Sequence, residues 1–60
     1  MRTAVVAKEW GEVVRNGHKI EDWAWEVTFL SDGVVVDRRC FKTEQFAQIA
    51  AILFEHGSVQ

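Results

Sequence analysis

The sequence predicts an α+β domain in which a three-stranded antiparallel sheet is followed by one C-terminal helix that packs on one face of the sheet. Three observations predict it: apolar alternation in residues 23–30, an Asp-Gly turn signal directly after that run, and a change from period two to period 3.6 after Thr43. Because the 60 residues contain no proline and no low-complexity linker, we expect a single domain, residues 1–60.

The central hairpin follows from local sequence alone. Residues 23–30 alternate and are rich in aromatic and β-branched side chains, as half-buried strands are. Asp32-Gly33 favours a two-residue type I′ turn, in which both central residues take a positive φ, and residues 34–41 form the return strand. The strand face that we expect to meet the helix carries Trp23, Trp25, Val27 and Phe29.

The first strand is expected within residues 2–15. Its alternation loses phase near Trp10-Gly11, which predicts a β-bulge there. Asn16-Gly17 then turns the chain, and residues 18–22 are interpreted as a polar loop that leads into the central strand. An alternative interpretation treats the Asn-Gly turn as a separate hairpin and gives a four-stranded sheet.

A helix is expected from Thr43 onward. Thr43 is a favourable N-cap residue, Glu44 suits the first turn, and Gly57 favours a left-handed stop. Apolar residues recur at helical spacing between them, which predicts one stripe that packs on the sheet. The stripe consists of Phe46, Ile49, Ala50, Leu53 and Phe54.

The sequence offers no catalytic or cofactor-binding motif. It has no glycine-rich phosphate-binding loop, and its carboxylates alternate with bases or lie at turns and caps, so no buried acid pair can be placed. His18, Cys40 and His56 lack the spacings of a zinc site. We therefore expect a protein that is not an enzyme and that needs no metal and no cofactor.

The cysteine content and hydropathy indicate a compartment. Cys40 is the only cysteine, so no internal disulfide can form, and a lone thiol fits a reducing environment. No run approaches the ~18 apolar residues of a membrane span. The chain is expected to be cytoplasmic and to have no membrane segment.

Candidate binding residues lie on the sheet face that the helix leaves open and where the first strand changes phase. If the Asp-Gly turn has two residues, Glu26 faces Arg39 across the ladder, and a shift by one residue brings it opposite Arg38. Either pair contributes roughly 0.2–1 kcal/mol. The selected residues are Trp10, Glu26, Thr28, Val35, Asp37 and Arg39.

These features favour a small non-catalytic interaction module that binds another protein through its open sheet face or an edge strand. Residues 21–37 hold five acids and no base. This acidic block also allows a module that covers a basic surface on its target, as a phage-type inhibitor or accessory protein would.

The segments Trp23-Ala24-Trp25-Glu26-Val27 and Phe41-Lys42-Thr43-Glu44-Gln45-Phe46-Ala47, with the turn glycine Gly33 between them, resemble a known family. They resemble the plant ethylene-response (GCC-box) DNA-binding domain and the N-terminal domains of tyrosine-type phage integrases. The resemblance implies three strands backed by one helix, with the open sheet face laid into the major groove. Binding nucleic acid is the alternative function, but the net charge of −2 disfavours it because phosphate neutralisation dominates DNA affinity.

Unpaired strand edges predict self-association. The third strand opens with Val34-Val35-Val36, and the first holds an apolar run over residues 4–7. Natural edges are usually blunted by proline, lysine or bulges, and this chain has no proline. We expect a homodimer with the first strand as its seam, because Arg38 and Arg39 guard the end of the third.

Overall fold

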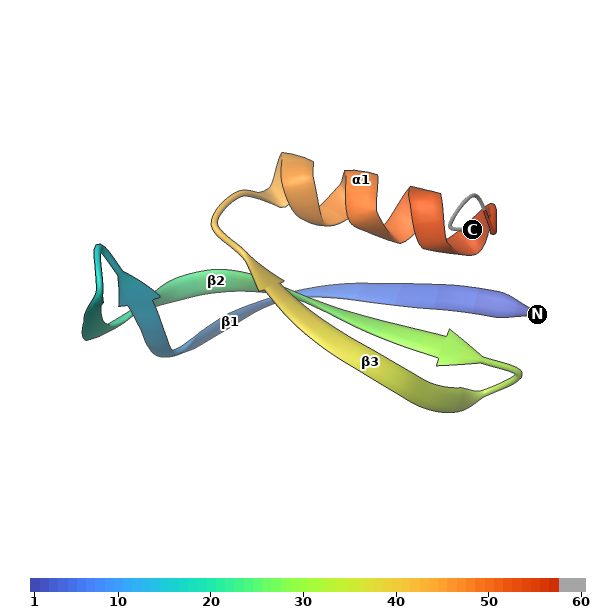
Figure 1. Cartoon of the computed structure of the whole chain (residues 1–60), viewed down its shortest axis with the longest axis horizontal. Helices are drawn as coiled ribbons and strands as arrows, with labels where there is room; N and C mark the ends of the chain where they lie inside the picture. The colour runs from blue at the N-terminus through green and yellow to red at the C-terminus, as the bar shows by residue number, and fades with distance from the viewer. Residues whose placement is uncertain (58–60) are drawn as a thin grey trace.

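The computed structural model describes residues 1–57, which form a three-stranded antiparallel sheet covered on one face by a single helix (Figure 1). The elements are β1 (Arg2–Arg15), β2 (His18–Ser31), β3 (Val34–Phe41) and α1 (Glu44–Glu55). The strands lie in the order β1-β2-β3. The predicted fold class and topology are therefore confirmed.

The pairing of β1 with β2 runs without interruption from Arg2 opposite Ser31 to Arg15 opposite His18. The predicted bulge at Trp10-Gly11 is wrong, and residues 18–22 are the first part of β2 rather than a loop. The four-stranded alternative is also wrong, because the Asn-Gly turn closes the β1–β2 pair itself. Asn16 (φ 53°) and Gly17 (φ 78°) occupy the left-handed region, so the turn adds only two residues and the register is fixed from this end.

A bulge lies instead between β2 and β3. The register shifts between Phe29 and Leu30: Leu30 lies opposite Val35, but Phe29 lies opposite Asp37. Val36 is thus the extra residue, and it reverses the alternation of β3 beyond it. The Asp32-Gly33 turn is formed as predicted, with φ of 51° and 81°.

The helix packs on the sheet through small residues. Its N-cap is formed as predicted, since the Phe46 N–H donates to Thr43 Oγ1 at 3.3 Å. Ala47 and Ala51 are its buried residues, at 0% and 5% exposure. They form the core with Val27 and Phe29 of β2, and the partly buried apolar residues packed against them are Ala4, Val6, Trp25, Phe41, Ala50 and Phe54.

The expected helix stripe is therefore only partly right. Ala50 and Phe54 pack on the core, but Phe46, Ile49 and Leu53 are 61%, 45% and 49% exposed. Two apolar rows overlap on this helix, and the row built on alanines faces the sheet because it lets the helix backbone approach closely.

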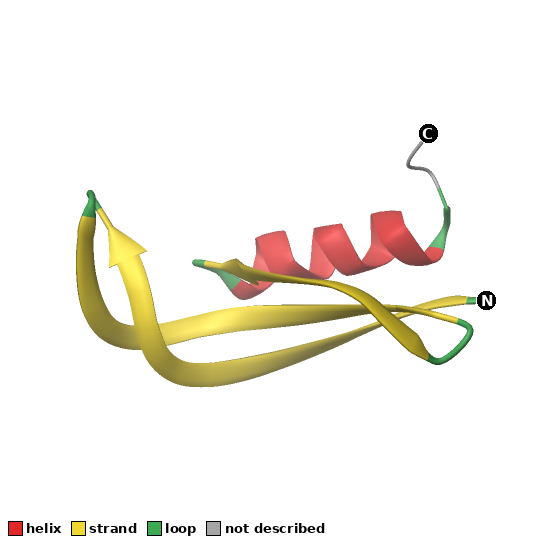
Figure 2. Ribbon diagram, turned by 60° about the horizontal axis from the view of Figure 1, so that its bottom comes forward, coloured by secondary structure: helices red, strands yellow, loops and turns green. Residues whose placement is uncertain are grey.

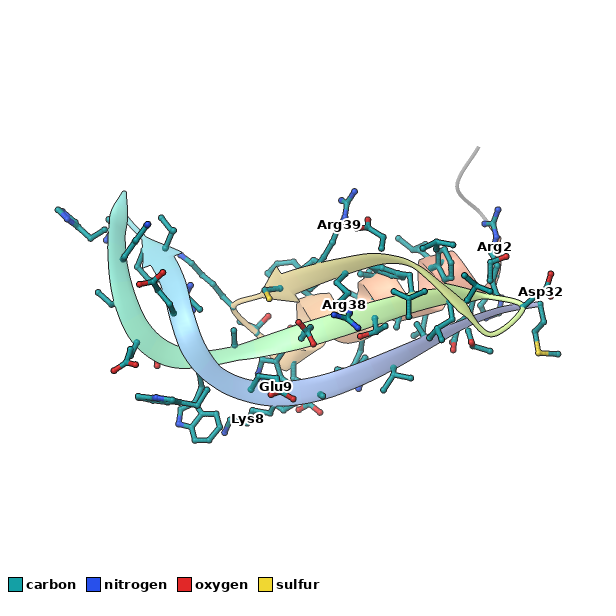
Figure 3. The ribbon with its side chains drawn as sticks, turned by 90° about the horizontal axis from the view of Figure 1, so that it is seen from below. Arg2, Lys8, Glu9, Asp32, Arg38 and Arg39 are labelled. Carbon is teal, nitrogen blue, oxygen red and sulfur yellow. The ribbon has the colours of Figure 1, made fainter. Side chains whose placement is uncertain are left out.

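Residues 10–23 form an arm that neither β3 nor α1 accompanies, since β3 pairs only with residues 25–31 of β2. A 12-residue helix is about 18 Å long, whereas a 14-residue strand extends about 46 Å. Figures 2 and 3 show that the arm curves toward the side on which β3 lies. Trp23, expected in the core, is consequently 48% exposed.

The alanine interface generates a stability prediction. Ala47→Leu should destabilise the domain by roughly 1–3 kcal/mol, because the added methylenes have no room between helix and sheet. Gln48→Leu, which adds the same side chain at the neighbouring exposed position, should leave the free energy of unfolding nearly unchanged. Urea unfolding followed by tryptophan fluorescence measures both, and equal stabilities for the two variants would contradict the observed helix face.

Candidate interaction surface

Two tryptophans face each other at the base of the arm. Trp10 of β1 lies opposite Trp23 of β2, with ring centroids 5.3 Å apart and ring planes at 72°. This edge-to-face geometry is favourable for aromatic pairs. Trp10 is 54% exposed, so the pair is held in place by the strands without being buried.

Lys8 extends this pair toward the body of the domain. Its Nζ lies 4.9 Å from the Trp23 ring centroid and 5.8 Å from that of Trp25, within the range of cation–π attraction. Figure 3 shows Lys8 beside the stretch of strand where the arm begins to curve. We call Lys8, Trp10, Trp23 and Trp25 the aromatic cluster.

Two carboxylates stand next along the arm. Glu12 lies opposite Glu21, two residues beyond Trp10 and Trp23 and therefore on the same face of the hairpin. Like charges directly opposite each other destabilise a strand pair. Within the described residues 1–57 neither glutamate forms an ion pair. An acidic pair thus borders the exposed aromatic pair.

Alternation places the aromatic cluster on the helix side of the sheet. Trp10 and Lys8 belong to the same β1 series as Ala4 and Val6, which pack beneath α1. The cluster therefore continues the helix-covered face into the part of the hairpin that the helix does not reach.

The open sheet face brings together three of the six predicted binding residues. Thr28 lies opposite Arg38, Glu26 opposite Cys40, and Val35 opposite Leu30. Glu26 and Thr28 are only partly exposed. Neither arginine faces Glu26, so the expected cross-strand pair is wrong. Figure 3 shows Arg38 lying over β2 on this face, and sequence reasoning did not select it as a binding residue.

The bulge moves Asp37 and Arg39 to the helix side. Arg39 Nε donates to Asp37 Oδ2 at 3.1 Å, and the backbone N–H of Arg38 donates to Asp37 Oδ1 at 2.8 Å. The backbone hydrogen bond first, and the arginine second, hold the pKa of the Asp37 carboxyl below its ordinary value. Both side chains remain substantially exposed, so the ion pair adds little stability.

A groove separates β3 from α1. Its volume is about 430 Å³. The residues that line it are Phe29, Asp37, Arg39, Phe41, Ala50, Leu53 and Phe54. Apolar side chains form most of this lining, and the Asp37–Arg39 pair stands at its edge.

Site chemistry is limited to these contacts in the described part of the chain. No group of three or more His, Cys, Asp and Glu side chains among residues 1–57 could hold a metal ion. Over the same residues no polar or charged side chain is buried. The helix that they form is too short and too polar to span a bilayer.

Of the six predicted binding residues, Trp10 alone lies in the aromatic cluster. Lys8 and Trp23 join it only because the β1–β2 register is unbroken, which the sequence did not indicate. Comparison of the chain with protein families, curated proteins and solved structures finds no match.

The Asp37 hydrogen bonds predict a titration. In Arg39→Gln the pKa of Asp37 should rise part of the way toward its ordinary value, whereas Arg38→Gln, which keeps the backbone N–H, should leave it nearly unchanged. Because the folded-state pKa is depressed, the stability that this carboxylate contributes is present above its ordinary pKa and is lost as the pH falls through the folded-state value. Carboxyl NMR titration of both variants measures the pKa of Asp37. A larger rise of this pKa in Arg38→Gln than in Arg39→Gln would contradict the prediction.

Proposed function

We propose that this domain is a non-catalytic protein-binding module that engages its partner through the aromatic cluster. The observation that carries the proposal is the exposed Trp10–Trp23 pair, fixed across two paired strands at the base of the arm. Tryptophan is enriched among residues that dominate binding energy at interfaces. A cross-strand pair loses little side-chain freedom on binding, because the strands already restrict both rings.

The aromatic cluster is a better candidate for an interface than the open sheet face, because its exposed side chains are larger. The aromatic cluster offers two large aromatic side chains that are about half exposed, whereas the exposed apolar residues of the open face are the smaller Val5 and Val35 and its Glu26 and Thr28 are partly covered by their neighbours. The arm also stands clear of α1 and β3, so a partner can enclose it from several sides (Figure 2). Enclosure excludes water, which is what makes a central aromatic contact strong.

The acidic pair indicates the chemistry of the partner. Glu12 and Glu21 repel each other in the free domain, and a lysine or arginine of the partner would relieve the repulsion. We therefore infer a target with an apolar pocket bordered by basic residues. A small inhibitor or accessory protein of the phage type fits this chemistry, and the exposed lone thiol of Cys40 supports a cytoplasmic location.

Capture of the partner from a lysate of the source cell, followed by affinity measurement with the identified protein, tests the proposal. Replacing Trp10 and Trp23 together by Thr should weaken binding by at least about 25-fold, the equivalent of a hot spot of about 2 kcal/mol. Val5→Thr with Val35→Thr, two exposed positions on the open sheet face, is the matched control and should bind as wild type does. Far-UV circular dichroism verifies folding. Loss of binding in the control alone would refute the proposal in favour of the open face.

Charge provides a second prediction. Glu12→Gln with Glu21→Gln should slow association with the captured partner and flatten its dependence on salt, because both carboxylates steer a basic surface. Surface plasmon resonance at several salt concentrations measures this. An unchanged association rate would show that the partner is not basic at this point.

Duplex DNA is the competing target. The open face contains Arg38, whose cross-strand neighbour is Thr28. Glu26 lies on the same face, two residues from Thr28, and the chain carries a net negative charge. A gel shift with nonspecific duplex DNA at about 50 and 200 mM salt distinguishes the two, since a phosphate-binding face loses affinity steeply over this range. Salt-sensitive binding of DNA would overturn the protein-binding proposal.

A further inference from the structure

The sheet has one covered edge and one bare edge. The helix packs mainly on β1 and β2, and the Glu55 carboxylate accepts a hydrogen bond from the Ala4 N–H at 3.1 Å, which occupies a backbone donor of β1. On β3 the Arg38 N–H donates to Asp37 Oδ1 of the same strand at 2.8 Å, and within the described residues no side chain of the helix bonds to the β3 backbone. An unpaired strand edge of this kind is a template for another strand.

Exposed apolar side chains gather beside the bare edge. Val34 and Val36 of β3 are 64% and 55% exposed. Leu53 lines the groove on the β3 side of α1, and Ile49 and Phe46 continue its row because they lie four and seven residues earlier on the helix. The α1 side of the groove is therefore apolar, and this apolar surface continues from Leu53 along the exposed row of Ile49 and Phe46.

The single chain buries little. Among residues 1–57 the buried apolar residues are two large ones, Val27 and Phe29, and three alanines. Its accessible surface is 4586 Å², whereas a compact monomer of 6.9 kDa exposes about 4000 Å². Its radius of gyration of 12.3 Å likewise exceeds the value of about 10.4 Å for a compact 60-residue domain.

We propose that two copies of the chain form a symmetric dimer by antiparallel pairing of their β3 edges. The product is a six-stranded sheet with both helices on one face. Because each helix is displaced toward β1, each leaves room over β3, and the Phe46–Ile49 row of one copy fills the groove of the other. This proposal does not depend on the partner-binding function, since the aromatic cluster belongs to β1 and β2, whereas the proposed seam belongs to β3 and α1.

A second copy of the chain is the partner that best fits the surface formed by the β3 edge, the groove and the apolar row of α1. A two-fold interface must be self-complementary, and this one carries an unpaired edge, an apolar row, a matching groove, and one acid and one base in Asp37 and Arg39. A stable interface takes about 800 Å² from each partner, so the β3 edge, the groove and the apolar row would all have to take part. The arm also curves toward the β3 side (Figure 3). In the proposed dimer it would therefore reach round the end of the partner's sheet. The first strand, expected as the seam from the sequence, is the edge that Glu55 caps.

Sedimentation equilibrium of the full chain tests the association. Wild type should sediment at twice the 6.9 kDa of one chain, and its melting temperature should rise with concentration because dimerisation stabilises the folded state. Ile49→Glu should raise the dissociation constant at least thirtyfold, since it buries an unpaired charge. Gln48→Glu adds the same charge at the adjacent exposed position and should dimerise as wild type does. A wild type that remains monomeric at high micromolar concentration, or equal dissociation constants for the two variants, overturns the proposal.

The lone cysteine locates the seam. A spin label on Cys40, which is exposed on β3, should show dipolar broadening, because in the proposed dimer the labelled strands are neighbours and, with the two-fold axis at the middle of β3, the two labelled positions are about 17 Å apart. In a dimer joined through β1 the labelled strands would be five spacings, or about 24 Å, apart. A dimer without broadening would place the seam elsewhere and refute the β3 interface.

Discussion

The unbroken register between β1 and β2 is the constraint on which the rest of the structure depends. The Asn16-Gly17 turn brings two 14-residue strands into direct opposition along their whole length. Neither β3, with 8 residues, nor α1, with 12, is long enough to accompany such a hairpin. An arm with exposed side chains on both faces is therefore a geometric consequence of element lengths, and the Trp10–Trp23 contact exists because the register carries each ring opposite the other.

The alanine contact between α1 and the sheet is the second determinant. Ala47 and Ala51 bring the helix close to Val27 and Phe29, but they bury little area and turn the bulkier Phe46 and Ile49 outward. A domain with so small a core gains stability from whatever covers these side chains. The same choice of helix face thus explains both the modest core and the apolar surface at which a second copy would pack.

Local chemistry made much of the fold predictable. Both turns require positive φ at residues that tolerate it, the N-cap needs a hydroxyl, and the central strand alternates clearly, so three strands and a helix could be placed from sequence. The position of the bulge could not, because it depends on how two strands pair. For that reason the sequence pattern puts Asp37 and Arg39 on the open face, whereas the structure puts Arg38 there, opposite Thr28.

The candidate site was less accessible to sequence reasoning. Trp10 was selected because it lies at an apparent phase break, whereas the structure shows no break and places it opposite Trp23. Whether Trp23 belongs to the core depends on how far the helix reaches, which no local pattern encodes. The helix face was misassigned because two apolar rows overlap, and only the fit to the sheet selects the one with alanines.

Both the aromatic cluster and the shape of the molecule depend on the ordered arm. Cross-strand NOEs between facing residues of β1 and β2 test it most directly, recorded on the wild-type chain. An unbroken register predicts contacts that continue past Trp10 and Trp23, through Val13 and Ile20, to the Asn16-Gly17 turn. Contacts that end at Gly11, or that shift by one residue beyond it, would contradict an ordered arm.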